Sequence, residues 1–209
     1  LFPVEIRGAE DGVRVTLTNS AGIRLLSSEE ASRPYPVKLA GVVTYSDPGW
    51  GLLFVRDSIA GVFVSLNAPP YPTNGEQVEV TGQTASGSFL SIVSGASWRH
   101  LGVGTMPVPR SIDDPELFAS QIDCEWTTVN GGVRRVALTE SGDHFQLDVI
   151  HRGWTVRVFV PFSTKAEATT LSGLVDARIK VAGVGGVDID SLRGARSLKM
   201  FVPSVSLIQ

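Results

Sequence analysis

Hydrophobic and polar residues alternate in short runs along most of the chain. Residues 77–81 place Val78 and Val80 on one side and polar residues on the other. Residues 155–160 and 178–182 repeat this pattern, and the runs are rich in β-branched residues and end near Gly, Pro, Asp or Asn. Alternation with a period of two predicts antiparallel strands with one buried face, whereas helical periodicity is scarce.

Two of these runs occur twice, so the chain contains an internal repeat. The run around Gly41 matches the run around Gly131, 90 positions later. Residues 77–82 match residues 178–183 at an offset of 101 positions. A repeat of this kind constrains the whole architecture, because each copy should fold into the same unit.

The two offsets differ by 11 residues, which the second copy must hold between its first and fourth strands. Residues 165–174 account for this insertion and are the best candidate for a helix, with Ser163 or Thr164 as N-cap and Gly173 near the end. The equivalent stretch of the first copy, 67–75, contains three prolines and predicts a loop.

A helix between the third and fourth strands and a glycine inside a long first strand are typical of a small closed barrel, the oligonucleotide/oligosaccharide-binding (OB) fold. We therefore predict an all-β protein made of two tandem OB-like five-stranded barrels with few short helices. The predicted domains are an N-terminal arm at 1–35, a first barrel at 36–110 and a second barrel at 111–209.

The arm and the junction between the barrels carry further signals. Residues 13–18 alternate like a strand, and residues 28–32 predict one or two helical turns. Residues 106–109 predict an extended connector, followed by a short helix capped by Asp113 or Asp114. The pattern assigns the arm to neither barrel, so packing on the first or the second stays open.

The composition is that of a folded globular protein with a slightly negative charge. Hydrophobic residues make up 43% and charged residues 19% of the 209 residues, which excludes a disordered chain. Eighteen Lys and Arg against 21 Asp and Glu give a net charge of −3, and neither barrel has a basic excess. Because nucleic-acid binders usually carry a basic stripe, we expect no nucleic acid as a partner.

The cysteine content and the chain start add two expectations. A single cysteine, Cys124, excludes an internal disulfide and a multi-cysteine zinc site, and we expect a small buried thiol. The chain starts at Leu1, as expected of a processed form or of a piece of a longer protein. No run approaches the roughly 18 apolar residues of a membrane span.

Two clusters of aromatic and polar residues are the candidates for ligand binding. The first surrounds the loop between the first two strands, which borders the binding face in OB barrels. Its tryptophan either stacks on a ring of a ligand or folds back over the barrel end or the other domain. The second cluster forms either a polar and aromatic patch or an edge strand with its tryptophan inward. The predicted ligand-binding residues are Tyr45, Asp47 and Trp50 in the first cluster, and Trp98, Arg99 and His100 in the second.

The sequence contains no recognisable motif for catalysis or metal binding. The other histidines, His144 and His151, are not spaced as a metal-binding pair, and Asp188 with Asp190 offers too few oxygen ligands for calcium. No Gly-x-Ser-x-Gly, His-Glu-x-x-His or reactive-cysteine pattern occurs. We expect no metal, no cofactor and no enzymatic activity, although an active site assembled from distant loops is left open.

Residues 36–48 and 53–57, with shorter stretches elsewhere, resemble the extracytoplasmic region of bacterial sensor histidine kinases and related membrane signalling proteins. In that family a tandem β module precedes a membrane span and a signalling domain. The resemblance implies a periplasmic location and a membrane-anchored parent protein, and it assigns no residue a role. The chain departs from the family pattern at 130–132, where Asn-Gly-Gly replaces a valine-rich strand.

These observations lead to three functional hypotheses. The preferred one is a non-catalytic sensor region that binds an unidentified small ligand or protein, so that a stimulus changes the relative placement of two rigid barrels. The alternative is a structural or protein-interaction module, possible as a homodimer through exposed strand edges. The third is binding of an oligosaccharide or a single-stranded nucleic acid by the OB faces, the latter disfavoured by the charge.

Overall fold

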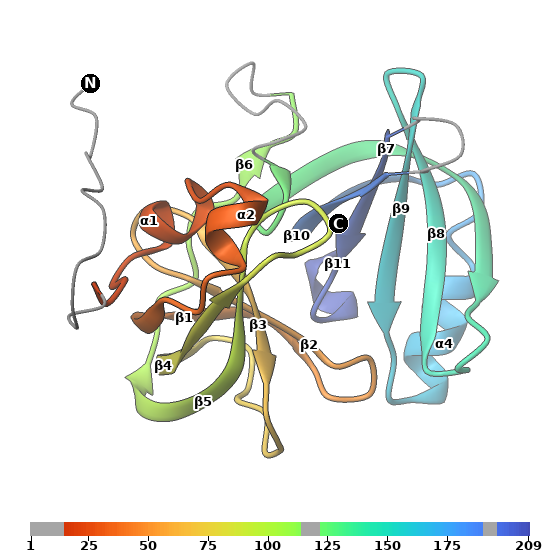
Figure 1. Cartoon of the computed structure of the whole chain (residues 1–209). Helices are drawn as coiled ribbons and strands as arrows, with labels where there is room; N and C mark the ends of the chain where they lie inside the picture. The colour runs from red at the N-terminus through yellow and green to blue at the C-terminus, as the bar shows by residue number, and fades with distance from the viewer. Residues whose placement is uncertain (1–14, 114–121, 190–195) are drawn as a thin grey trace.

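The computed structural model is an all-β chain folded into two tandem OB barrels that lie side by side (Figure 1). It describes residues 15–113, 122–189 and 196–209. The predicted fold class is confirmed.

The first barrel is closed by five strands in the order β1-β2-β3-β5-β4, with β4 returning to pair with β1. The pairing of β3 with β5 is parallel and the others are antiparallel. Valine and leucine side chains from all five strands fill the interior, as the alternation predicts. The strands are β1 (Pro36–Asp47), β2 (Leu52–Arg56), β3 (Gly61–Leu66), β4 (Glu76–Ala85) and β5 (Ile92–Val103).

The second barrel repeats this order as β7-β8-β9-β11-β10, closed by the pairing of β10 with β7. Here β11 is parallel to β9, as β5 is to β3. A short extra strand, β6 (Arg110–Ser111), runs parallel to β7, so this sheet has six strands rather than the predicted five. The other strands are β7 (Trp126–Leu138), β8 (His144–His151), β9 (Trp154–Pro161), β10 (Arg178–Ile189) and β11 (Arg196–Phe201).

Gly41 in β1 and Gly131 in β7 occupy equivalent places, as the internal repeat predicts. A Cβ atom at Gly41 would lie 2.6 Å from the carbonyl oxygen of Arg56, and one at Gly131 would lie 2.5 Å from that of Ile150. In both barrels the second strand therefore approaches the first too closely for any side chain at this position. Both glycines are required by the bend that closes the barrel.

The helix predicted in the insertion is α4 (Lys165–Ser172), between β9 and β10. Thr164 is its N-cap, because the Thr164 hydroxyl accepts a hydrogen bond from the Glu167 N–H and the Glu167 carboxylate accepts one from the Thr164 N–H. Leu171 is fully buried and packs into the second barrel's core. Residues 67–75 form the predicted loop in the first barrel.

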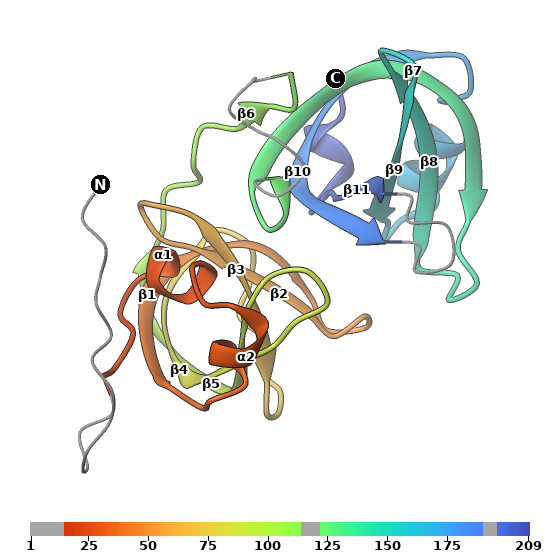
Figure 2. The same ribbon diagram turned by 45° about the horizontal axis from the view of Figure 1, so that its top comes forward.

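The arm packs on the first barrel, which settles the question that the sequence left open (Figure 2). It contains α1 (Ser20–Arg24), which was not predicted, and α2 (Ser28–Ala31), which was. Ile23 of α1 is fully buried in the first barrel's core. The Ser20 N–H and hydroxyl both donate to the carboxylate of Asp57, so the start of α1 is tied to the β2–β3 loop. A helix of one turn leaves no readable period in the sequence.

Other predicted elements have mixed outcomes. Residues 15–18 are the described part of the strand expected at 13–18, and within them Leu17 is paired through a single bridge to Val37. Residues 106–109, predicted as a connector, form neither helix nor strand. The helix expected after Asp113 or Asp114 falls largely outside the described residues. Within the described ranges, no helix is long and apolar enough to cross a membrane.

Candidate functional site

The two barrels meet along two rows of side chains, which together we call the seam. Each row consists of cross-strand neighbours, one from each of three or four strands. These side chains form a hydrophobic cluster separate from the cores of the two barrels. The rows are Tyr45, Phe54 and Phe63 in the first barrel and Trp126, Val184, Phe201 and Phe159 in the second.

Phe201 is at the centre of the seam. Its ring centroid lies 5.5 Å from that of Tyr45, 5.8 Å from that of Phe54 and 5.8 Å from that of Phe159. Phe54 and Phe201 are each 6% exposed. Burying a phenylalanine side chain contributes about 2 kcal/mol to stability. The seam therefore holds the two barrels in one arrangement and they do not move as independent domains.

At one end of the seam, the buried carboxylate of Glu125 joins the arm and both barrels. Glu125 is 6% exposed and accepts a hydrogen bond from the N–H of Gly61 at 3.1 Å. Its oxygens lie 3.4 Å from Nε of Arg56 and 3.5 Å from a guanidinium nitrogen of Arg24. Arg24 also donates to the carbonyl oxygens of Gly61 and Asp123. The negative charge of Glu125 is thus paired with two cations of the other barrel and its arm.

At the other end of the seam, a histidine of the second barrel lies between two carboxylates. Nε2 of His144 lies 2.7 Å from an Asp47 oxygen and Nδ1 lies 2.8 Å from an Asp143 oxygen. The Tyr45 hydroxyl donates to Asp47 at 3.2 Å, and the indole of Trp50 stacks on the imidazole with centroids 3.9 Å apart. Since both ring nitrogens face carboxylates, the geometry favours the doubly protonated imidazolium.

His144 joins the two barrels through Asp47, so we expect their docking to depend on the protonation of this histidine and thus on pH. Burial alone would lower the pKa of His144, but hydrogen bonds to Asp47 and Asp143 outweigh it and raise that pKa above its ordinary value. A raised pKa stabilises the folded state below the unfolded value of about 6.5, and this contribution is lost as the pH rises through the folded pKa. Hydrogen bonds from His144, Trp50 and Tyr45 lower the pKa of Asp47 despite its burial, so the Asp47 contribution is lost in acid.

We therefore expect the free energy of unfolding to fall from about pH 6.5 upward in the wild type, and to fall less in His144→Gln. Urea unfolding across this pH range, followed by tryptophan fluorescence, measures both slopes. Equal slopes in the two proteins would show that His144 does not carry the effect.

A groove opens along one side of the seam, and we call it the aromatic groove. Its larger part encloses about 640 Å³ and lies on β2 and β3 of the first barrel, beneath the β4–β5 loop. A shallower part continues to the β1–β2 loop and shares three lining residues with the larger part. Strands two and three with these two loops are where OB barrels bind oligonucleotides and oligosaccharides. The principal lining side chains are Trp50, Leu52, Phe54, Phe63, Phe159, Lys199 and Phe201.

The rim of the aromatic groove is polar and carries both signs of charge. The β4–β5 loop contributes Ser86, Ser88 and Ser91 to this rim, and the second barrel contributes Asp123 and Lys199. The Lys199 ammonium lies 5.7 Å from the centroid of the Phe201 ring, within reach of a cation–π interaction. Burial raises the pKa of Asp123, although hydrogen bonding and nearby cations oppose this. An apolar floor with a few polar rim groups is the usual design of a small-ligand site.

The first predicted cluster lies at the seam. Tyr45 is buried, Asp47 binds His144, and Trp50 lies over His144 and at the end of the aromatic groove. The Trp50 indole N–H also donates to the Ser141 hydroxyl of the second barrel at 3.3 Å. Of the two readings of Trp50, contact with the other domain is therefore realised, while one part of its surface still lines the groove.

The second predicted cluster lies on β5, away from the aromatic groove. Trp98 packs against the first barrel's core, and its indole N–H donates to the carbonyl oxygen of Pro70 at 2.7 Å. Arg99 pairs with Glu79 at 3.0 Å, and His100 contacts Glu76. The structure therefore does not bring the two predicted clusters together, and a ligand-binding role for Trp98, Arg99 and His100 stays a prediction.

Several residues of the seam and groove were not identified from the sequence. Phe54, Phe63, Phe159 and Phe201 sit on strands whose alternate positions are buried aliphatic residues, so a large aromatic residue on the outward face was the available signal. Glu125 and His144 gave no such signal, because their partners in the other barrel, Gly61 and Asp47, are more than 60 positions away in the chain. Contacts of that kind are decided by the packing of the barrels.

Cys124 is buried and free, as the sequence predicts, and lies in the seam. Burial raises the pKa of its thiol, with the neighbouring Asp123 acting in the same direction. A thiol of this kind is a poor nucleophile. Among the described residues, no group of three or more His, Cys, Asp and Glu side chains is arranged to hold a metal ion.

Comparisons with known proteins agree on the fold alone. No family model matches the sequence, and no curated protein matches it significantly. A chain from a structure of a replication protein A heterotrimer bound to ssDNA is 13% identical over 86% of this chain, with a TM-score of 0.36. A murine DNA-binding protein bound to double-stranded DNA is 14% identical, covers 78% of this chain and 92% of its own, and has a TM-score of 0.33.

A third structure, described as structural mimicry for functional antagonism, is 9% identical over 78% of this chain and 87% of its own, with a TM-score of 0.37. This chain spans about half, 49%, of the replication protein A chain that it matches. At these identities the likeness concerns the course of the backbone.

The expectation that nucleic acid is not a partner is contradicted by these neighbours. They include proteins bound to single-stranded DNA and to double-stranded DNA. The prediction relied on the net charge of −3 and on the lack of a basic barrel. Net charge describes the whole surface, whereas binding depends on the charges around one groove, so the exclusion is withdrawn.

Proposed function

We propose that this chain is a non-catalytic ligand-binding module, and that its ligand occupies the aromatic groove. The observation that carries the proposal is the position of this groove on strands two and three of the first barrel, where the OB fold presents its ligand face. Phe63 and Trp50 are partly exposed there and offer ring faces for stacking.

The groove favours a ligand with several rings in a row. Aromatic side chains follow one another from the β1–β2 loop to β3, and the serine-containing rim supplies hydrogen-bonding groups. An oligosaccharide presents such a series of rings without charge. A single-stranded nucleic acid is the second candidate, favoured by the Lys199 ammonium on the groove wall.

We further propose that the module is the sensor region of a membrane signalling protein. The support is the resemblance described above. Its main segments are 36–48, which covers β1 and the first residue of the β1–β2 loop, and 53–57, which covers most of β2 and the residue after it. Both barrels line the groove, so a ligand bound in it contacts both of them. Ligand binding would then favour one relative placement of the barrels over another.

The binding proposal is tested by titrating the chain with a panel of neutral oligosaccharides and with a mixed-sequence single-stranded oligonucleotide. We expect Phe63→Ala to weaken the binding of the active ligand about tenfold, since stacking on one ring contributes about 1–3 kcal/mol. Trp154→Ala is the matched control, because Trp154 is 67% exposed and outside the groove.

The two ligand classes separate by salt, because only the nucleic acid should bind more weakly as the salt concentration rises. Binding that Phe63→Ala leaves unchanged would place the ligand elsewhere, and the absence of binding by either class would refute the proposal. The sensor context is tested separately by a signalling assay of the intact parent protein carrying Phe63→Ala, in which an unchanged response would count against it.

A further inference from the structure

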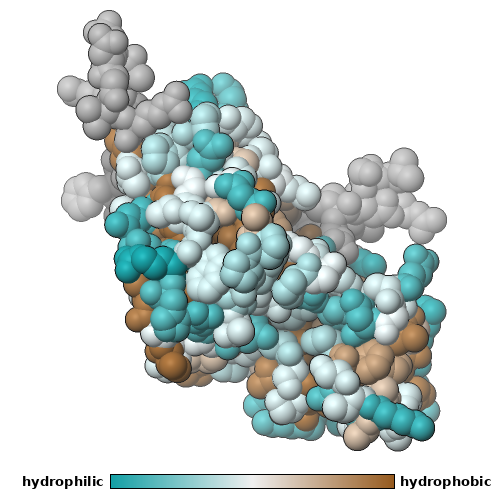
Figure 3. All heavy atoms as spheres, turned by 90° about the horizontal axis from the view of Figure 1, so that it is seen from below, coloured by the Kyte–Doolittle hydropathy of each residue, from teal (hydrophilic) through white to brown (hydrophobic). Residues whose placement is uncertain are grey.

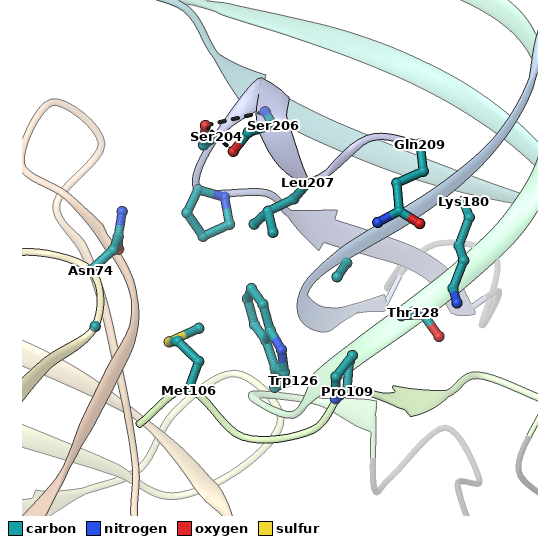
Figure 4. Close-up of a pocket in the computed structure, with 13 residues that line it drawn as sticks. Asn74, Met106, Pro109, Trp126, Thr128, Lys180, Ser204, Ser206, Leu207 and Gln209 are labelled. Atoms are coloured by element: carbon teal, nitrogen blue, oxygen red, sulfur yellow. Dashed lines mark hydrogen bonds between the residues drawn. The ribbon is translucent and has the colours of Figure 1, made fainter. Parts of the chain in front are cut away.

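A second pocket lies between β7, β10 and the C-terminal segment of the second barrel, and residues 74–75 of the first barrel and the connector at 106–109 also line it; we call it the β7–β10 pocket. It encloses about 450 Å³, within the range of small-ligand sites. Figure 4 shows the ring of Trp126 between Met106 and Pro109, with Leu207 across from it. These side chains give the pocket an apolar floor, and none of them lines the aromatic groove.

The side chains of Trp126 and Thr128 bring two hydrogen-bond donors to the lining of this pocket. Trp126 is 4% exposed and Thr128 is 8% exposed. Within residues 15–113, 122–189 and 196–209, neither the Trp126 indole N–H nor the Thr128 hydroxyl makes a hydrogen bond to the protein. Both groups are therefore available to donate to a ligand that accepts hydrogen bonds.

The positive charge of Lys180 also favours a ligand that accepts hydrogen bonds, and in particular an anion. Lys180 is the charged residue among the described lining residues, and it lies on the same side as Gln209 (Figure 4). No carboxylate of the described chain forms an ion pair with its ammonium group. The C-terminal segment that carries Gln209 is fixed to β10 by two hydrogen bonds. The Gln209 N–H donates to the Lys180 carbonyl oxygen at 2.9 Å, and the Lys180 N–H donates to the Gln209 carbonyl oxygen at 2.8 Å.

We propose that the β7–β10 pocket binds a small organic anion with an apolar body, such as an aromatic carboxylate. The body packs on Trp126, Met106 and Leu207, while the anionic group takes the Lys180 ammonium and the free donors of Trp126 and Thr128. A charge-assisted hydrogen bond of this kind is about twice as strong as a neutral one, so the carboxylate contributes much of the affinity. This site is independent of the function proposed for the aromatic groove.

The test uses the whole chain and two probes of equal shape, 2-naphthoate and neutral 2-naphthamide, in isothermal titration calorimetry. We expect naphthoate to bind about tenfold more tightly than naphthamide, and Lys180→Gln to remove this difference. Lys165→Gln, a change of an exposed lysine at the start of α4, is the matched control and should bind naphthoate like the wild type. Ala182→Phe fills the pocket and should abolish binding of both probes.

Three results would overturn the proposal. They are equal affinity for the two probes, unchanged naphthoate binding by Lys180→Gln, and no binding at about 1 mM naphthoate. Phe63→Ala separates the two sites, because it should leave naphthoate binding unchanged. Loss of naphthoate binding in Phe63→Ala would place the anion in the aromatic groove and would also refute the assignment.

Discussion

Glu125→Gln should lower the free energy of unfolding by about 3 kcal/mol, because it leaves two guanidinium groups at the seam without a negative partner. The glutamine keeps the volume of the side chain and can still accept the N–H of Gly61, so the change removes charge and little else. Arg24 and Arg56 have 14% and 19% of their side chains exposed, which limits how far water can replace the carboxylate.

Equilibrium urea unfolding measures this change, and Glu29→Gln is the matched control. Glu29 of α2 pairs with Arg33, just beyond the end of the helix, and 86% of the Glu29 side chain is exposed. Surface pairs contribute little, so the control should be indistinguishable from the wild type. Similar losses in both variants would mean that the Glu125 network does not hold the barrels together.

Gly61→Ala should lower the free energy of unfolding by about 3 kcal/mol through a steric clash. A Cβ atom at Gly61 would lie 1.8 Å from the carbonyl oxygen of Cys124, in the other barrel. That oxygen belongs to the backbone, so the two barrels would have to separate locally. The separation would also lengthen the hydrogen bond from the Gly61 N–H to Glu125.

Gly132→Ala is the control for this substitution. Gly132 lies on β7, and a Cβ atom there would meet no other atom within 4 Å. Alanine reduces the freedom of the unfolded chain, so this variant should be unchanged or slightly more stable than the wild type. Small-angle scattering of Gly61→Ala should show a larger radius of gyration if the barrels separate, and an unchanged radius with unchanged stability would contradict the described contact.

The seam also limits how a sensor built from these barrels could work. The seam packs Phe201, Phe54 and Tyr45 in a buried hydrophobic cluster, with Glu125 at one end and His144 at the other. The face shown in Figure 3 mixes residues of hydrophilic and intermediate hydropathy, with hydrophobic residues in patches rather than one continuous surface. A stimulus that moves one barrel against the other must therefore supply enough binding energy to repack the seam.

The sequence alone was enough to determine the fold, and for a local reason. The period of two defines strands, Gly41 and Gly131 mark the bend of each first strand, and the 11-residue offset locates α4. Each of these features depends on neighbours within one barrel, and the internal repeat presents them twice. One turn of helix, as in α1, is too short to leave such a signal.

Only the tertiary structure decided where the barrels touch and what lies between them. Trp50 could be read from its loop as a stacking residue, but its contact with His144 joins positions in different barrels. The same holds for Glu125 with Arg24 and Arg56, whose charges give no pattern along the chain. The period of two in the sequence shows which face of a strand is buried in its own barrel. It does not show which residues of the other barrel contact the outward face, because no local rule links residues so far apart in the chain. Those contacts depend on how the two folded barrels dock.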